Sequence, residues 1–195
     1  MNQVWTIQPL LVWERLQEER VLLVDESLAD ISWVDSYDWM RERMRERLPG
    51  NRGLYPWWAW YAPKPDLRRI RHHVNNERGK PYVRIELSLP DERVLISHLD
   101  AWVHVINGWI VPYTYKESLK WMDWVDTFEG GPLPEGAKAM REATWPRIFE
   151  RDLPARGRED RDGLESSIWV EDYWQATFEE LRMDDVQKVT HFLSG

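Results

Sequence analysis

The side chains best suited to chemistry lie between positions 57 and 71, in the sequence WWAWYAPKPDLRRIR. This stretch sets three indoles and a phenol beside a cluster of basic side chains. A flat anionic ligand such as a nucleotide needs both, because its base stacks on an aromatic face while its phosphates bind guanidinium groups. The candidate contacts are Trp58 or Trp60 with Tyr61 for the base, and Arg68, Arg69 and Arg71 for the phosphates.

The same composition also suits a core strand followed by a charged surface segment. The chain contains 14 tryptophans, and most recur at the spacing of helices or strands, which is typical of side chains that fill a core. The arginines would then pair with acidic side chains at the surface, where ion pairs contribute little to stability. The sequence leaves both interpretations open.

Other catalytic arrangements have weaker signals. The chain has no cysteine, which removes thiolate nucleophiles and zinc ribbons, and it has neither a glycine-rich phosphate loop nor a nucleophile elbow. His98, Asp100 and His104 have the one spacing worth testing for zinc, whereas His72 and His73 are adjacent and more typical of solvated residues. We expect no bound metal.

The charge balance limits the partners. The chain has 34 acidic and 26 basic residues and a net charge of −8, which repels nucleic acid and anionic membranes unless positive charge is concentrated locally. The start has no basic region followed by an apolar run, and no apolar stretch approaches the roughly 20 residues of a membrane helix. Together with the absence of cysteine, these features predict a cytoplasmic protein without membrane contact.

Periodicity predicts one α+β domain over residues 1–195, with a split, mainly antiparallel sheet and flanking helices. The clearest strand covers 81–90, where apolar and polar residues alternate as in a half-buried strand, with Arg84, Glu86 and Ser88 on the polar face. Residues 94–96 are expected to pair with it as a hairpin. A strand at 174–178 is expected to turn Gln175 and Thr177 to water. Further strands are expected at 4–8, 21–24, 57–61 and 187–192.

Helices are expected at 9–20, from Asp30 or Ser32 to residue 48, and at 115–129. The last follows a capping box from Thr114 to Glu117 and has apolar positions spaced as a buried face. Residues 151–167 are rich in charge, glycine and proline without periodicity, which predicts a mobile charged surface loop.

The whole chain resembles a small family of bacterial and phage proteins described as a domain of unknown function. The resemblance covers nearly the full length, and it implies no activity. The residues that carry it are Trp5–Pro9, Trp58–Tyr61, Pro65–Arg68, Leu95–Ser97 with Asp100 and Trp102, and Gln175–Phe178.

The order of elements is also similar to that of ADP-ribosyltransferases, including the toxins that modify DNA. This similarity implies an ADP-ribosyltransferase-like fold, NAD as cofactor, and cleavage of its glycosidic bond by positioning and electrostatic stabilisation. The late strand of that family presents a carboxylate, whereas Thr177 stands at the corresponding position here and Glu179 follows two residues on. The implied catalytic residues are Thr6, Gln175 and Glu179, and the implied NAD contacts are Trp5, Trp60, Tyr61, Arg68 and Arg71.

A different class of function is the alternative for these residues. The chain could be a non-catalytic interaction module that uses the same groove, or its acidic helices, to hold a nucleotide, a nucleic acid or a protein partner. Fold-level similarity does not decide between the two.

Overall fold

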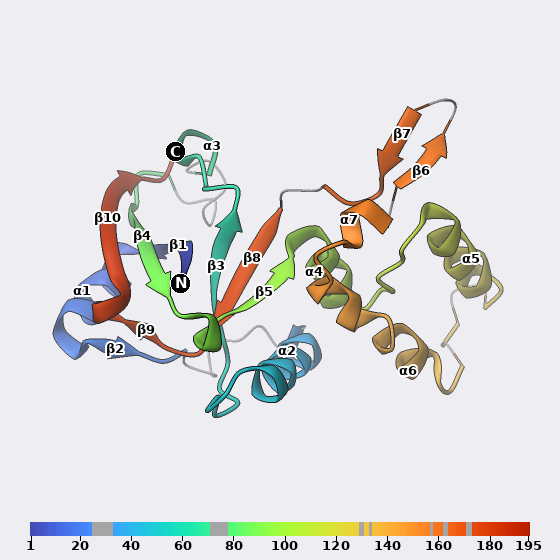
Figure 1. Ribbon diagram of the computed structural model, residues 1–195, viewed down its shortest axis with the longest axis horizontal. Coiled ribbons are helices and arrows are strands. Elements are labelled where there is room, and N and C mark those ends of the chain that lie inside the picture. The colour runs from blue at the N-terminus through green and yellow to red at the C-terminus, as the bar shows by residue number, and fades with distance from the viewer. Residues whose placement is uncertain are drawn as a thin grey trace. The chain divides into compact units, whose positions relative to one another are not determined.

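A six-stranded, mainly antiparallel sheet is built from the first and last parts of the chain (Figure 1). The computed structural model describes residues 1–24, 33–70, 78–128, 131–132, 134–156, 158–161, 164–170 and 173–195. The strands follow the order β10-β4-β1-β3-β8-β5. Their bounds are β1 Asn2–Pro9, β3 Trp57–Ala62, β4 Pro81–Leu89, β5 Leu95–His98, β8 Trp174–Phe178 and β10 Val186–Leu193. The predicted α+β class is therefore confirmed, whereas the ADP-ribosyltransferase-like topology stays a prediction.

The chain forms two compact units. Unit 1 comprises Met1–Ile96 and Trp174–Gly195, and unit 2 comprises Ser97–Tyr173. The single domain expected over 1–195 stays a prediction. None of the described helices combines the length and the apolar composition that crossing a membrane requires.

The core of unit 1 lies between the sheet and α1, which spans Leu10–Glu19. The core face predicted for β4 is confirmed, because Val83, Ile85, Leu87 and Leu89 are fully buried, but Tyr82 and Glu86 on its other face are buried as well. Leu16 of α1 and Phe178 of β8 complete the same cluster. Burying such side chains is the main stabilising term in folding, at about 1.5–3 kcal/mol for each large aliphatic residue.

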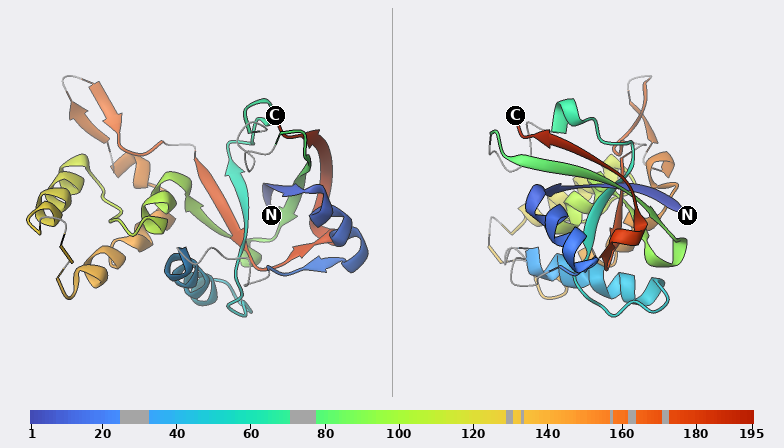
Figure 2. Two further views of the ribbon diagram at one scale, coloured as in Figure 1. Left: turned by 180° about the vertical axis from the view of Figure 1, so that it is seen from behind. Right: turned by 90° about the vertical axis from the view of Figure 1, so that its left-hand side faces the viewer.

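The hairpin expected between 81–90 and 94–96 is wrong. β4 lies between β1 and β10, and its pairing with β1 runs in continuous register from Asn2↔Leu89 to Pro9↔Tyr82 (Figure 2). Both edges of β4 are therefore occupied. The turn at Asp91–Arg93 carries the chain away, and β5 joins the far edge of the sheet beside β8.

The strand expected at 21–24 is shorter than predicted. β2 covers only Val21–Leu22 and pairs with β9, Leu181–Arg182, in a separate two-stranded ribbon. Val21 and Leu23 are exposed, so this apolar run is not an inner strand. The continuous apolar pattern failed because only Leu22 reaches the core.

The wet face expected for β8 is also wrong, because all five of its residues are buried. The helix α2, Val34–Arg47, covers part of this face. The Thr177 hydroxyl donates to the carbonyl of Leu95 at 3.2 Å and lies 4.0 Å from the sulfur of Met40 in α2. Thr177 is thus an interior residue with specific partners.

Unit 2 is mostly helical, and its helix α5 begins with the predicted Thr114 cap, whereas the Glu117 carboxylate bonds to the residue before the cap and not to Thr114 itself. The Thr114 hydroxyl accepts the backbone N–H of Glu117, and the Glu117 carboxylate accepts that of Tyr113 at 2.7 Å. The 151–167 segment contains α7 and the β6–β7 hairpin, and its mobility stays a prediction. The elements are α4 Leu99–Ile106, α5 Tyr115–Asp126, α6 Ala137–Glu142, a 3-10 helix Trp145–Phe149, α7 Leu153–Arg156, β6 Arg158–Arg161 and β7 Leu164–Ser167.

Candidate functional site

Three of the predicted site residues lie in one row across the sheet of unit 1. Trp5 stands opposite Trp60, and Trp60 stands opposite Gln175. Directly opposed residues of antiparallel strands point to the same face and lie about 5 Å apart. Trp5 also stands opposite Glu86, so a carboxylate, two indoles and an amide share this face.

Glu86 is the charged centre of this row. Its side chain is only 6% exposed, and its carboxylate lies 2.9 Å from Lys64 Nζ and 3.4 Å from Arg84 Nη2. Burial acts to raise the pKa of Glu86, but the ammonium of Lys64 and the guanidinium of Arg84 outweigh it, so this pKa lies below its usual value. Lys64 also lies over the Trp5 ring at 5.3 Å. The carboxylate is therefore ionised and fully engaged at neutral pH.

Thr6 and Tyr61 do not join this row. Thr6 follows Trp5 on the strand and so faces the other side of the sheet, where its hydroxyl donates to the carbonyl of Trp58 at 2.9 Å. Tyr61 packs against the hydrophobic core. Neither side chain can line a surface together with Trp60.

The predicted phosphate contacts are placed differently again. Arg68 lies in the short helix α3, Leu67–Ile70, with 89% of its side chain exposed, and it binds both carboxylate oxygens of Asp66. Arg71 lies outside the described residues. The side chain of Arg69 is likewise outside the described part of the structure, so Arg68 is the predicted phosphate contact that can be placed, and it is already paired with Asp66.

Glu179 holds a loop in place. One carboxylate oxygen accepts the backbone N–H groups of Arg52 and Leu54 at 2.9 and 3.0 Å, and the other lies 3.4 Å from Arg52 Nε. The side chain is 11% exposed. These bonds fix the chain between α2 and β3, which gives the Glu179 carboxylate a structural role.

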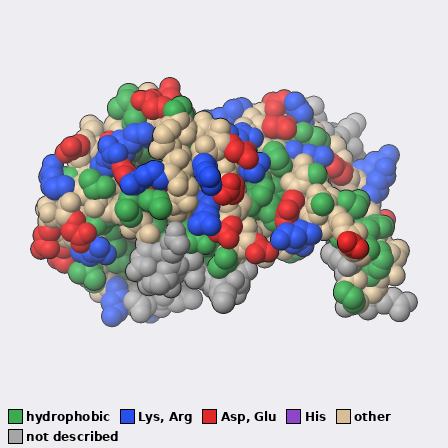
Figure 3. Space-filling view, turned by 90° about the horizontal axis from the view of Figure 1, so that it is seen from below, with side chains coloured by type: hydrophobic (Ala, Val, Ile, Leu, Met, Phe, Trp, Pro, Cys, Tyr) green, Lys and Arg blue, Asp and Glu red, His purple; other side chains and the backbone are tan. Residues whose placement is uncertain are grey.

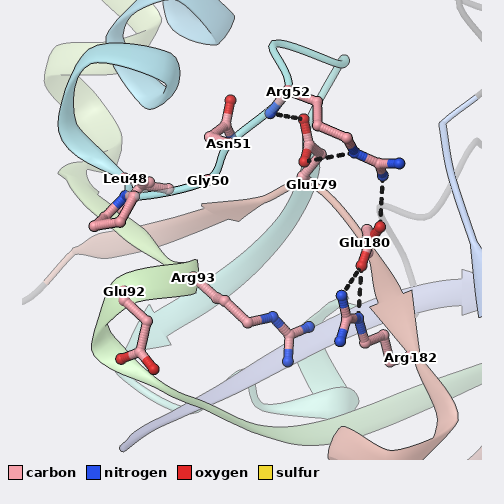
Figure 4. Close-up of a pocket in the computed structure, with 10 residues that line it drawn as sticks. Leu48, Gly50, Asn51, Arg52, Glu92, Arg93, Glu179, Glu180 and Arg182 are labelled. Carbon is pink, nitrogen blue, oxygen red and sulfur yellow. Dashed lines mark hydrogen bonds and ion pairs between the residues drawn. The ribbon is translucent and has the colours of Figure 1, made fainter.

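The pocket beside Glu179 is lined by paired charges (Figure 4). It encloses about 390 Å³ between the end of α2, the Asp91–Arg93 turn and β9. Glu180 bridges Arg52 and Arg182, and Arg93 binds Asp185 through two bonds of 2.7 and 2.9 Å. Because each of these arginines already has a carboxylate partner, the pocket has no excess positive charge for a phosphate.

The predicted NAD contacts lie on several different elements. Trp5 and Trp60 share one face of the sheet, Tyr61 packs on the other, Arg68 lies on α3, and Arg71 is outside the described residues. NAD binding stays an untested prediction, and no catalytic step is derived from it.

The two histidines considered for zinc are structural. Burial lowers the pKa of His98 and of His104, and each ring is bonded to a backbone carbonyl, His98 to Val170 and His104 to Ile110, both at 2.8 Å. Both rings pack edge-on against Trp169. Among the described residues, no three His, Cys, Asp or Glu side chains are grouped as metal ligands.

Unit 2 carries the largest departure from the sequence prediction. None of the twelve residues of α5 is buried, although its apolar positions have the spacing of a core-facing helix. Tyr115, Leu119 and Met122 are 40%, 39% and 53% exposed. The remaining apolar residues Trp121, Trp124 and Val125 are half-buried. The predicted apolar face is real, and part of it faces water.

Two apolar grooves flank Trp121 of α5. One, of about 370 Å³, is lined by α5 and by the segment from His104 to Ile110, with Trp109 53% exposed at its wall. The other, of about 320 Å³, lies between α5 and α6 and ends at Met140, which is 56% exposed. Hydrophobic side chains are visible among the charged ones on the surface of the molecule (Figure 3). We call the exposed side chains of Tyr115, Leu119 and Met122 the α5 stripe.

Comparison with known proteins gives one result. The family model described as Domain of unknown function (DUF3841) matches residues 3–187. The searches of curated proteins and of solved structures each found no match. The resemblance to a domain of unknown function is therefore confirmed over nearly the whole chain, which belongs to the DUF3841 family.

Proposed function

We propose that this chain is a non-catalytic interaction module that binds a protein partner through unit 2. The observation that carries the proposal is the α5 stripe, a row of large apolar side chains on a helix with no buried residue. Exposed apolar patches of this kind mark interaction sites, because leaving them in water is unfavourable.

The composition of the surface supports a protein as the partner. Tryptophan, tyrosine and methionine line the two grooves and the stripe, and these residue types are enriched at the centre of protein interfaces. Fully burying one such side chain stabilises a complex by about 1.5–3 kcal/mol. Three or four of them are enough to offset much of the entropy lost on association.

Charge argues against a nucleic acid at this surface. Residues 97–173 contain 15 Asp and Glu against nine Lys and Arg, a net charge of −6, so unit 2 carries most of the −8 of the chain. A polyanion would be repelled from such a surface. A protein with an apolar contact surface and basic residues would be attracted.

Site-specific crosslinking tests the proposal. In one variant of the chain a photo-crosslinking amino acid replaces Leu119. In a control variant the same amino acid replaces Glu18, an exposed residue of α1. We expect one reproducible protein crosslinked from position 119 and not from position 18. The purified partner should then bind the chain with a negative heat-capacity change, as burial of apolar surface requires, and Met122→Glu should abolish this binding. Undiminished binding by Met122→Glu would show that the stripe is not the interface.

A further inference from the structure

We infer that the partner presents an amphipathic helix whose basic end lies beside Asp126. This inference rests on the proposed function and specifies what the α5 stripe and its neighbouring groove recognise. It follows from the spacing of the stripe, the chemistry of the groove and the position of unpaired carboxylates.

The stripe has the spacing of a helix-packing seam. Tyr115, Leu119 and Met122 stand at positions i, i+4 and i+7, so their side chains lie above one another on one side of α5. Asp126, at i+11, continues the same line at the C-terminal end. An apolar row of three residues that ends in a carboxylate is complementary to a second helix with the same repeat and a basic residue at one end.

The groove beside the stripe favours a helix over an extended peptide. Its walls are side chains of α5, of α4 and of the segment that follows α4, with the buried Ile110 at its floor. A bound strand would need a sheet edge to satisfy its backbone, and none of the residues that line this groove belongs to a strand. A helix satisfies its own backbone hydrogen bonds and needs only apolar contacts.

The charges at the end of the groove select a basic occupant. Asp126 lines the groove, and neither it nor Asp123 forms an ion pair with another described residue. Both lie in the last turn of α5, where the helix dipole adds negative potential. A lysine or arginine on the partner would therefore be bound here. A second copy of the same acidic unit would be repelled, since like charges would meet across the interface.

Synthetic helical peptides of about 20 residues provide the probe, titrated into the full chain and followed by calorimetry. Each peptide carries leucine or methionine at the helix-seam positions. The basic form has lysines at the end expected to lie beside Asp126, and the acidic form has glutamates at that end. A third form has the basic composition in scrambled order. We expect the basic amphipathic peptides to bind about tenfold or more tightly than the acidic and scrambled forms.

Variants of the chain decide which contacts are responsible. We expect Met122→Glu to weaken the affinity of the chain for the basic peptide by about tenfold or more. Asp126→Lys should lower the affinity for the basic peptide and raise the affinity for the acidic one, because it reverses the charge at the end of the groove. Glu18→Lys, which changes the net charge by the same amount on α1, should leave both affinities unchanged.

Three results would overturn the inference. One is that no basic amphipathic peptide binds, and another is that the acidic and scrambled forms bind equally well. The third is that sedimentation shows a dimer of the chain which Met122→Glu dissociates, because the occupant would then be a second copy. If the crosslinking at position 119 succeeds while the peptides fail, only the helical occupant is wrong. If both fail, the proposed function is wrong as well.

Discussion

Glu86 illustrates how a polar side chain becomes part of the interior of unit 1. Its alternation with Val83 and Ile85 predicts a wet face, yet its side chain is buried and paired with Arg84 and with the partly exposed Lys64. An alternating pattern predicts that one face of a strand is apolar. It cannot predict that a segment distant in sequence covers the other face of that strand. The covering residue Lys64 is 22 positions away, beyond the reach of any local pattern.

Removing this charge should destabilise unit 1. Glu86→Gln keeps the shape of the side chain but leaves Lys64 and Arg84 without their carboxylate, which should lower the free energy of unfolding by about 1–3 kcal/mol at pH 7. Urea denaturation measures the change, with Glu18→Gln on the exposed face of α1 as the matched control. An equal effect of the two substitutions would contradict the assigned role of Glu86.

Glu86 also gives the stability a pH dependence at acid pH. Because its folded-state pKa lies below the ordinary value of about 4.5, the unfolded state binds the proton first as the pH falls. The contribution is therefore present above about pH 4.5 and is lost as the pH falls through the folded-state pKa. Glu86→Gln should show a smaller loss of stability over this range than the unchanged chain.

His98 should make unit 2 less stable in mild acid. Burial lowers its pKa, against the Val170 carbonyl and the Asp100 charge, while the unfolded chain titrates near pH 6.5. The unfolded state then binds more protons below pH 6.5, so the free energy of unfolding falls as the pH drops below that value. His104 acts in the same direction.

His98→Asn tests this dependence, because Asn can still accept the N–H of Ala101 as a helix cap but does not titrate. The smaller side chain lowers stability at every pH, so the informative quantity is the slope of the free energy of unfolding between about pH 6.5 and 5. We expect a shallower slope in the variant. An unchanged slope would show that His98 is not the buried group that titrates.

At the level of helices and strands, features set by residues close in sequence were predicted correctly, whereas the pairing of distant strands was not. The cap at Thr114, the core face of β4 and the closing strand β10 follow from side chains that interact with their neighbours in sequence. The hairpin after β4 failed because strand pairing is decided by which strand buries most surface, and β1 pairs along the whole of β4. The row of Trp5, Trp60 and Gln175 depends on the same long-range register.

The apolar face of α5 was predicted from the sequence, but its exposure was not. Its apolar spacing predicts a helix correctly, but spacing cannot distinguish a face that is buried within the chain from one reserved for a partner. The only available signal was the excess of aromatic and methionine residues on this helix, which a core helix also shows.

Substitutions on α5 should accordingly leave folding intact. Met122→Glu removes an exposed contact and should change the free energy of unfolding by less than about 0.5 kcal/mol. Trp145→Ala, in the interior of the same unit at 2% exposure, should lower it by about 3–5 kcal/mol. Thermal and urea denaturation of the two variants measure the difference. A large loss from Met122→Glu would mean that the stripe supports the fold.

For the whole molecule, the arrangement of the predicted NAD contacts leads to a clear expectation. Because these residues divide between two faces of a sheet and its surroundings, NAD at millimolar concentration should leave the melting temperature unchanged. A ligand present at 100 times its dissociation constant would add about 2.7 kcal/mol of stability, which a thermal-shift titration detects easily. A shift of this size would support the nucleotide site predicted from the sequence.

The most direct test of the interaction surface is a crosslinking scan along α5. A photo-crosslinking amino acid is placed in turn at positions 115, 119 and 122 of the stripe and at 116, 120 and 123 on the polar side of the same helix. The proposal predicts crosslinks to one protein partner from the three stripe positions and none from the polar positions, in phase with the 3.6-residue helical repeat. Equal crosslinking from both sides, or none from the stripe, would contradict it.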